Sequence, residues 1–260
     1  LQQEISDTIN KQLEAQAYNP EILRELRTIN LAENNKFFLW HTWFSDVFNR
    51  DDREGFDIVI GNPPYIGEKG HKEIFQPVKS DIHLGQYYLG KMDYFYFFFH
   101  LAFNMLSPHG VAIFITTNYY PTALGARRLR ADIKDRMSIK TLFNLGELRL
   151  FENAPGQHNM ISSFAKGKDG CKCQVIDVHK KGALNPIMFT SIINHIDEDT
   201  TYADVAQEDL YDGEENYIRL QNSSSDNPLS SLLDKIQLRN NTLGNIAEVN
   251  AGIMGGCDSI

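Results

Sequence analysis

A short stretch that follows an apolar run contains four residues that together could hold an amino group. Residues 56–67 read FDIVIGNPPYIG, with Asn62, Pro63, Pro64 and Tyr65 directly after the apolar part. Two consecutive prolines lack backbone donors, so this turn is stiff and presents carbonyl oxygens that no local N–H can claim. The side-chain carbonyl of Asn62 and the backbone carbonyl of Pro63 offer two acceptors, which suit the two donors of an –NH₂ group. Tyr65 adds a flat face for a planar base.

This pair of acceptors would favour attack by the nitrogen on an electrophile. Accepting both hydrogens stabilises the tetrahedral nitrogen that develops in the transition state, which is preorganised electrostatic stabilisation. Proton abstraction before the attack is then unnecessary. The alternative interpretation is structural, a proline-stiffened loop in which Asn62 caps a neighbouring group and Tyr65 packs. The strand before the motif and the tyrosine after it favour the chemical interpretation.

A buried strand must position the motif. Residues 56–61 are apolar apart from one aspartate, as expected of a strand in a parallel sheet, and such strands end where ligands bind. Strands alternating with helices predict an α/β fold, and two final strands without a helix between them predict an antiparallel finish. The expected helices are 91–106 and 121–137, and the other expected strands are 110–117, 139–146, 160–167 and 173–180.

The charge of the chain is unevenly distributed. The formal net charge is −9, but residues 197–215 hold nine acidic residues and no basic one, and the rest of the chain is formally neutral. The expected helix at 121–137 is basic. Its arginines Arg127, Arg128 and Arg130 are candidates for contact with phosphates, although a solvated helix face would have the same composition.

Several other classes of site have no support in the sequence. The three cysteines fit neither a disulfide framework nor a zinc site, and they indicate reduced thiols in a cytosolic protein. The eight histidines show no metal-ligand spacing, so no metal is expected. The longest aromatic run, residues 94–106, is too short to span a membrane. We therefore expect a cytoplasmic protein without a membrane segment.

The motif also resembles that of a known family. GNPPY after an apolar strand is similar to the catalytic motif of amino-group methyltransferases that use S-adenosylmethionine. Motif order over roughly residues 40–180 resembles the adenine-N6 DNA methyltransferases, in particular the modification module of type IIG restriction–modification enzymes. The resemblance implies a Rossmann-like α/β methyltransferase fold. It also implies transfer of a methyl group to N6 of an adenine flipped out of double-stranded DNA.

The resemblance assigns roles to individual residues. Asn62 and the Pro63 carbonyl would hold the amine, with Pro64 stiffening the turn, and Tyr65 would stack on one face of the base. Phe151, in LFENAPGQHNMISSF, would cover the other face. Asp46 lies sixteen residues before Asn62, where the family has the acidic residue that binds the adenine of the cofactor, and Phe98, in DYFYFF, would be a second cofactor contact.

The resemblance also implies a division of the chain. Residues 1–182 would form a partial catalytic core, 183–230 an acidic connecting region, and 231–260 the start of a target-recognition domain. Nothing in residues 1–40 has the form of the glycine-rich cofactor loop that precedes these motifs in the family, so we expect a fragment with an incomplete cofactor site. A nuclease domain or subunit outside the fragment is left open. The alternatives are a protein-glutamine or ribosomal-RNA amino-methyltransferase and a non-catalytic DNA-binding subunit.

Overall fold

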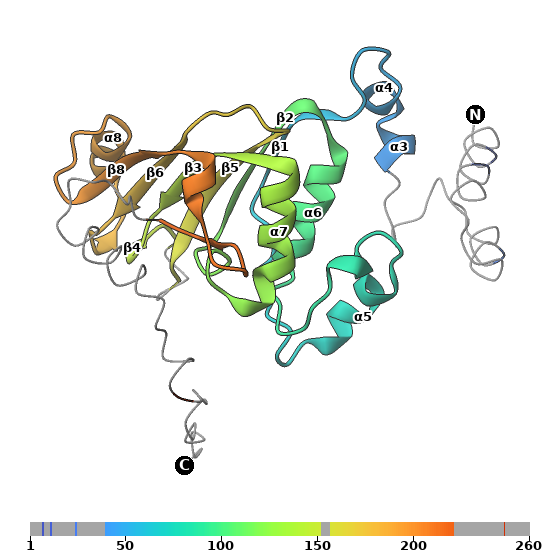
Figure 1. Ribbon diagram of the computed structural model, residues 1–260, viewed down its shortest axis with the longest axis horizontal. Coiled ribbons are helices and arrows are strands. Elements are labelled where there is room, and N and C mark those ends of the chain that lie inside the picture. The colour runs from blue at the N-terminus through green and yellow to red at the C-terminus, as the bar shows by residue number, and fades with distance from the viewer. Residues whose placement is uncertain are drawn as a thin grey trace.

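A computed structural model describes residues 40–151 and 157–220, together with the single residues 7, 11, 24 and 247. Six strands form one central sheet in the order β1-β2-β5-β3-β6-β8 (Figure 1). They are β1 (Phe56–Gly61), β2 (Leu106–Thr117), β3 (Met137–Asn144), β5 (Asn159–Lys166), β6 (Cys173–Val178) and β8 (Thr200–Val205). The short strands β4 (Leu148–Arg149) and β7 (Gly182–Ala183) pair with each other, as do β9 (Tyr211–Asp212) and β10 (Tyr217–Ile218).

The sheet is mixed. β1 is parallel to β2 and β3 is parallel to β6, whereas β5 lies antiparallel between β2 and β3. The strands β1, β2, β3 and β6 therefore share one direction, and their carboxyl ends meet at one edge of the sheet. The predicted partial Rossmann-like α/β fold is confirmed. The predicted antiparallel finish is present only in part. β5 is antiparallel but lies inside the sheet, and β6 is parallel to β3. The antiparallel strand at the end of the sheet is β8, which was not predicted.

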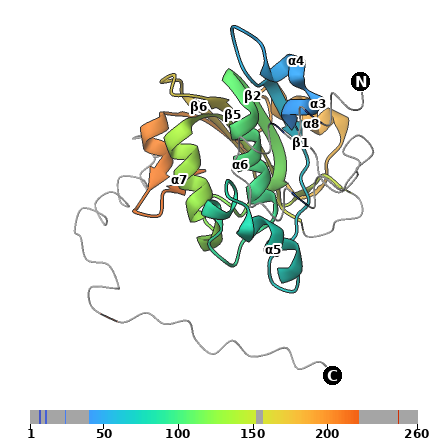
Figure 2. The ribbon, with the colours of Figure 1, turned by 90° about the vertical axis from the view of Figure 1, so that its right-hand side faces the viewer.

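Helices cover both faces of the sheet. On one face α6 (Phe95–Met105) and α7 (Arg127–Arg136) lie side by side (Figure 2), where Phe99 stacks on Phe114 at 4.7 Å. On the other face α8 (Pro186–Ile193) packs against the far strands, with Ile192 fully buried. The remaining helices are α3 (Trp40–Trp43), α4 (Ser45–Phe48) and α5 (Lys72–Ser80), with short 3₁₀ turns at Gly85–Tyr87, Leu124–Ala126 and Gln207–Leu210.

Residues 200–205 lie inside the predicted connecting region 183–230. They form β8, which pairs along its whole length with β6. The acidic residue Asp197, just before this strand, is buried and bonded to Lys180 and to the hydroxyl of Thr200. The described part of the acidic region is therefore joined to the sheet. The predicted third region, 231–260, lies outside the described residues except for Ala247. Within the described ranges, no helix is both long and apolar enough to cross a membrane.

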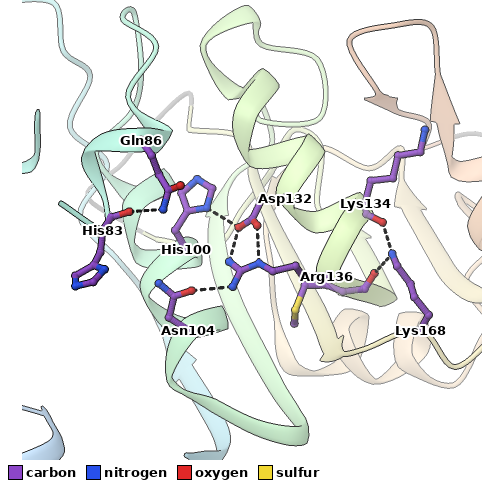
Figure 3. A network of polar contacts seen from close by, with 9 residues as sticks. His83, Gln86, His100, Asn104, Asp132, Lys134, Arg136 and Lys168 are labelled. Atoms are coloured by element: carbon purple, nitrogen blue, oxygen red, sulfur yellow. Dashed lines mark hydrogen bonds and ion pairs between the residues drawn. The ribbon is translucent and has the colours of Figure 1, made fainter. Parts of the chain in front are cut away.

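A buried polar cluster joins α6 to α7 (Figure 3). The Nδ1 atom of His100 lies 2.6 Å from Asp132 Oδ2, and Arg136 binds the same carboxylate at 2.6 and 2.7 Å. Tyr87 stacks on the His100 ring at 3.5 Å. Burial lowers the pKa of His100 despite its bond to Asp132. Burial alone would raise the pKa of Asp132, but the bonds from His100 and Arg136 lower it. The cluster thus fixes the helix that flanks the motif.

Candidate active site

The motif Asn62–Tyr65 directly follows β1, at the edge where the parallel strands end. Asn62 and Pro64 are exposed, Pro63 is buried and Tyr65 is half-buried. Among the described residues, no side-chain hydrogen bond engages the amide of Asn62, so the Asn62 side chain is available to a ligand. This placement agrees with the general position of ligands in α/β sheets, outside the carboxyl ends of the strands.

Tyr65 follows β1 in a loop and is held by contacts with two other elements, β2 and α6. Its hydroxyl donates to the backbone carbonyl of Ile115 in β2 at 2.9 Å. Its ring meets the edge of Phe95, the first residue of α6, with centroids 5.9 Å apart. Burial raises the pKa of Tyr65 to about 12, despite the opposing effect of a hydrogen bond with Asn159. The phenol therefore stays neutral at physiological pH, and the ring can act as a stacking surface and not as a base.

An apolar pocket of about 270 Å³ lies beside the motif. The motif contributes Asn62, Pro63 and Pro64, and α6 contributes Phe98, so the structure brings Phe98 beside the motif, and its contact with a cofactor stays a prediction. The other lining residues are Trp40, Phe56, Val59, Ile60, Gly61, Leu101, Ala102, Met105 and Phe114. Its apolar wall and the polar Asn62 at its rim suit a ligand with a flat or aliphatic body.

Asp46 is not brought to this pocket. It is exposed on α4, where the neighbouring Val47 carbonyl accepts from the Gly55 amide at 3.3 Å, so it lies near the start of β1. The six residues of β1 span about 20 Å, which separates Asp46 from Asn62 at the other end of the strand. The physical reason is that residues 40–48 form two short helices whose aromatic rings pack on Phe56, the first residue of β1.

Phe151 is half-buried and comes just after β4. It follows β3, and three strand spacings separate β3 from β1, about 14 Å in all. No described contact joins Phe151 to Tyr65. Residues 152–156, the next part of the segment, lie outside the described residues. The structure therefore places Phe151 after a strand end on the same sheet edge as the motif, but not against it.

The three candidate arginines of the basic helix α7 bind other parts of the protein. Arg127 forms an ion pair with Glu215 at 3.0 Å, and Arg128 donates to the Tyr88 carbonyl at 2.7 Å. Arg130 is fully buried, and its guanidinium donates to the carbonyl groups of Tyr120, Ala123 and Glu215. Burial excludes Arg130 from contact with DNA in this conformation. The acidic segment thus neutralises part of the basic helix, which the linear sequence did not reveal.

Sequence analysis did not identify a polar chain along the same edge of the sheet. Asn118 donates to the side chain of Asn144 at 2.9 Å, and Asn144 donates to Asp177 at 2.7 Å. These residues lie just after β2, at the end of β3 and near the end of β6. The sequence signal that could have revealed these contacts is a polar residue at or near the end of each of these three predicted strands. These hydrogen-bonded side chains join the strand ends beside a second, polar pocket of about 330 Å³.

The described residues include no group of three or more His, Cys, Asp or Glu side chains that could hold a metal ion. Cys171 and Cys173 are free thiols. A nucleotide-like cofactor could use the pocket wall around Phe98, but the described residues around that pocket include no carboxylate. The pocket therefore fits part of such a ligand.

The chain is similar to known restriction-modification methylases over the part that contains the motif. The family model for Eco57I restriction-modification methylases matches residues 2–151, more than half of the chain. The chain is also similar to the type II methyltransferases M.HincII and M.HindII of Haemophilus influenzae, each 26% identical over 134 residues. That match covers 51% of this chain and 26% of each relative, so the chain spans about a quarter of the length of these curated relatives.

Solved structures with a similar arrangement are more distant. The type I restriction-modification methyltransferase subunit from Streptococcus thermophilus is 15% identical, with a TM-score of 0.48, and the match covers 75% of this chain and 43% of that one. The type IIG restriction endonuclease BpuSI is also 15% identical, with a TM-score of 0.45, and the match covers 78% of this chain and 25% of that one. Because the family model covers more than half of the sequence, the chain belongs to the Eco57I restriction-modification methylase family.

Proposed function

We propose that the protein transfers a methyl group from S-adenosylmethionine to N6 of an adenine in double-stranded DNA. One observation carries the proposal: the Asn62 amide is exposed at the carboxyl end of β1, next to a tyrosine ring that contacts with β2 and α6 hold in place. Membership of a restriction-modification methylase family and similarity to relatives named type II methyltransferases support it.

The chain would activate the amine through acceptors alone. Asn62 Oδ1 and the Pro63 carbonyl would each accept one hydrogen of the adenine amino group. Two such bonds favour a nitrogen that becomes tetrahedral as it attacks. S-adenosylmethionine, when bound, supplies an electrophilic methyl group, and its methyl–sulfur bond breaks to leave a neutral thioether as the new N–C bond forms. The neutral Tyr65 would not act as a base. The methylated nitrogen would lose its extra proton to solvent water after the new bond has formed.

The target base has to leave the helix before its amino group can reach Asn62. Tyr65 would stack on one face of the extruded base and Phe151 on the other, each stacked ring contributing roughly 1–3 kcal/mol. No described contact joins Phe151 to Tyr65, so the stacking role of Phe151 rests on the family resemblance and is tested by substitution.

Phe98 and the motif would form the wall of the cofactor site that adjoins the reacting nitrogen. Asp46 lies near the start of β1, where Trp40 and Phe56 line the same pocket, and its contact with the cofactor stays a prediction. A ribose-binding carboxylate and a glycine-rich loop would come from outside the described residues. We further propose that residues 231–260 begin a target-recognition domain, and a nuclease domain or subunit outside this chain is left open. A cytoplasmic location would suit such an enzyme.

Nucleoside analysis tests the proposal against its rivals. The full-length protein is incubated with unmethylated plasmid DNA and isotope-labelled S-adenosylmethionine, and the DNA is digested and analysed by mass spectrometry. The proposal predicts labelled N6-methyladenine. Label in ribosomal RNA or in a glutamine of a protein substrate would support the related amino-methyltransferases, and no label in any substrate would support a non-catalytic subunit.

A further inference from the structure

The segment that follows the motif folds back on the residues that lead into α6. The amide of Tyr94 donates to the Ile66 carbonyl at 2.8 Å, and the amide of Glu68 donates to the Met92 carbonyl at 2.8 Å. Between them, Gly67 forms an antiparallel bridge with Asp93. Residues 66–68 and 92–94 thus form a short ladder, which starts one residue after Tyr65 and ends one residue before Phe95. Both rings of the Tyr65–Phe95 contact are anchored by this ladder.

A buried carboxylate fastens the ladder from one side. Glu68 is only 7% exposed, and its two oxygens are used by different partners. One accepts from the hydroxyl of Tyr88 and lies 3.3 Å from the Lys79 ammonium, which also sits over the Tyr88 ring at 4.3 Å. The other oxygen accepts from the backbone amide of Lys91 at 2.6 Å. Burial would raise the pKa of Glu68, but these partners together lower it, so the group is a carboxylate.

The backbone next to this carboxylate is in an unfavourable conformation. Lys91 has a φ of 52°, in the left-handed region that residues with a side chain rarely adopt. A non-glycine residue in that region persists when surrounding contacts hold it there. The bond from the Lys91 amide to Glu68 is such a contact. A second is the close approach of Gly125, where a Cβ atom would lie 2.2 Å from the Lys91 carbonyl oxygen.

We infer that Glu68 is a positioning residue for Tyr65. Its carboxylate holds Tyr88, Lys79 and Lys91 around the ladder, and the ladder holds the Tyr65 ring against Phe95 in the orientation that receives a base. The inference rests on the proposed function, because the base is the group that Tyr65 would stack on. Glu68 itself touches neither the base nor the cofactor.

The test uses the full-length protein and a DNA duplex that contains 2-aminopurine in place of the adenine that the wild-type protein methylates. Fluorescence of this analogue reports the extruded base, and kcat and KM for methyl transfer are measured on the unmodified duplex. Glu68→Gln keeps the size of the side chain but loses its charge and one acceptor. Glu73→Gln is the matched control, since Glu73 is exposed on α5 in the same segment, and within the described residues its carboxylate pairs with His71, at 3.9 Å.

We expect Glu68→Gln to reduce the extruded population and kcat/KM about tenfold or more, because small displacements in a preorganised site are costly. Glu73→Gln should match the wild type. A role confined to general stability would not depend on Tyr65, so the decisive variant is Glu68→Gln combined with Tyr65→Ala. If Glu68 acts through Tyr65, the added substitution causes little further loss in kcat/KM beyond that of Tyr65→Ala.

Two results would overturn the inference: unchanged base capture in Glu68→Gln, or losses that multiply when it is combined with Tyr65→Ala. If Glu68→Gln melts at a much lower temperature, Tyr88→Phe replaces it, since that change removes one bond to Glu68 and keeps the ring. Its smaller loss, of a few-fold, should likewise disappear in the Tyr65→Ala background. Failure of the proposed function is distinguishable, because the wild-type protein would then neither methylate the duplex nor extrude the analogue.

Discussion

The hydroxyl of Tyr65 donates a hydrogen bond of 2.9 Å to the backbone carbonyl of Ile115, which lies fifty residues further along the chain. This bond ties the end of β1 to the end of β2. It also explains why a tyrosine stands here, since a phenylalanine would offer the same stacking surface without the anchor. The ring is thus preorganised before any base arrives.

Two substitutions at Tyr65 separate the anchor from the stacking surface. Tyr65→Phe should lower base capture only a few-fold, because the ring remains but loses one hydrogen bond of about 1 kcal/mol. Tyr65→Ala should lower it much more, since stacking contributes roughly 1–3 kcal/mol. Fluorescence of 2-aminopurine at the target position measures both. Equal losses in the two variants would mean that the hydroxyl, not the ring, is the functional group.

Phe151→Ala should weaken base capture and leave thermal stability nearly unchanged. Phe151 is half-buried, and a stacking residue at an open edge contributes little to the core. The matched control is Phe164→Ala, because Phe164 is fully buried between Phe99 and Phe103. That change should cost about 3–5 kcal/mol of unfolding free energy. If Phe151→Ala destabilises the protein comparably and base capture is normal, Phe151 is a packing residue.

The exposed arginines at the start of α7, Arg127 and Arg128, give a prediction about the salt dependence of DNA binding. Because Arg127 and Arg128 already bind Glu215 and the Tyr88 carbonyl, replacing either with glutamine should not change the salt dependence of DNA binding. The slope of log K against log salt, measured by titration, falls in magnitude by about 0.9 for each lost phosphate contact. A slope reduced by that amount in Arg127→Gln would show that the helix releases Glu215 and binds DNA.

The buried His100 predicts a pH dependence of stability. Its pKa in the folded protein lies below the usual 6.5, because burial disfavours the imidazolium. As the pH falls below about 6.5, the unfolded state therefore binds more protons, and the free energy of unfolding decreases. Denaturant unfolding between about pH 7.5 and about pH 5 measures how the free energy of unfolding changes with pH. This range extends at least about one pH unit on each side of the ordinary histidine pKa.

His100→Asn can still donate to Asp132 but does not titrate, so the slope in that pH range should become shallower. His83→Asn serves as the control, because His83 is exposed and outside the cluster with Asp132 and Arg136. The same slope in His100→Asn and the wild type would contradict this explanation.

Much of the fold was predictable because its signals are local. The apolar run at 56–61 and the strands near 110–117, 139–146, 160–167 and 173–180 correspond to β1, β2, β3, β5 and β6 in the structure. Each is an apolar segment bounded by residues that end strands, which the sequence displays directly. The position of Asn62 at a strand end followed from the same signal. The proximity of Phe98 followed from the family resemblance.

What could not be predicted depends on contacts between distant segments. Spacing alone places Asp46 sixteen residues before Asn62, but it does not say that the intervening chain runs along β1 and carries the two residues to opposite ends. The pairing of Arg127 with Glu215 spans 88 positions, so a basic helix and an acidic run looked independent. The contacts of the Glu68 carboxylate likewise join residues up to 23 positions apart.

The most direct test of the proposed chemistry is Asn62→Ala in the full-length protein, with single-turnover methyl transfer and DNA affinity measured on the same duplex. Removing one of two acceptors on the amine should slow methyl transfer by roughly 10²–10³-fold, the scale for one preorganised hydrogen-bonding group. DNA affinity and thermal stability should change little, because the Asn62 side chain is exposed. Loss of affinity with normal transfer in the bound complex would contradict the assignment and make Asn62 a binding residue.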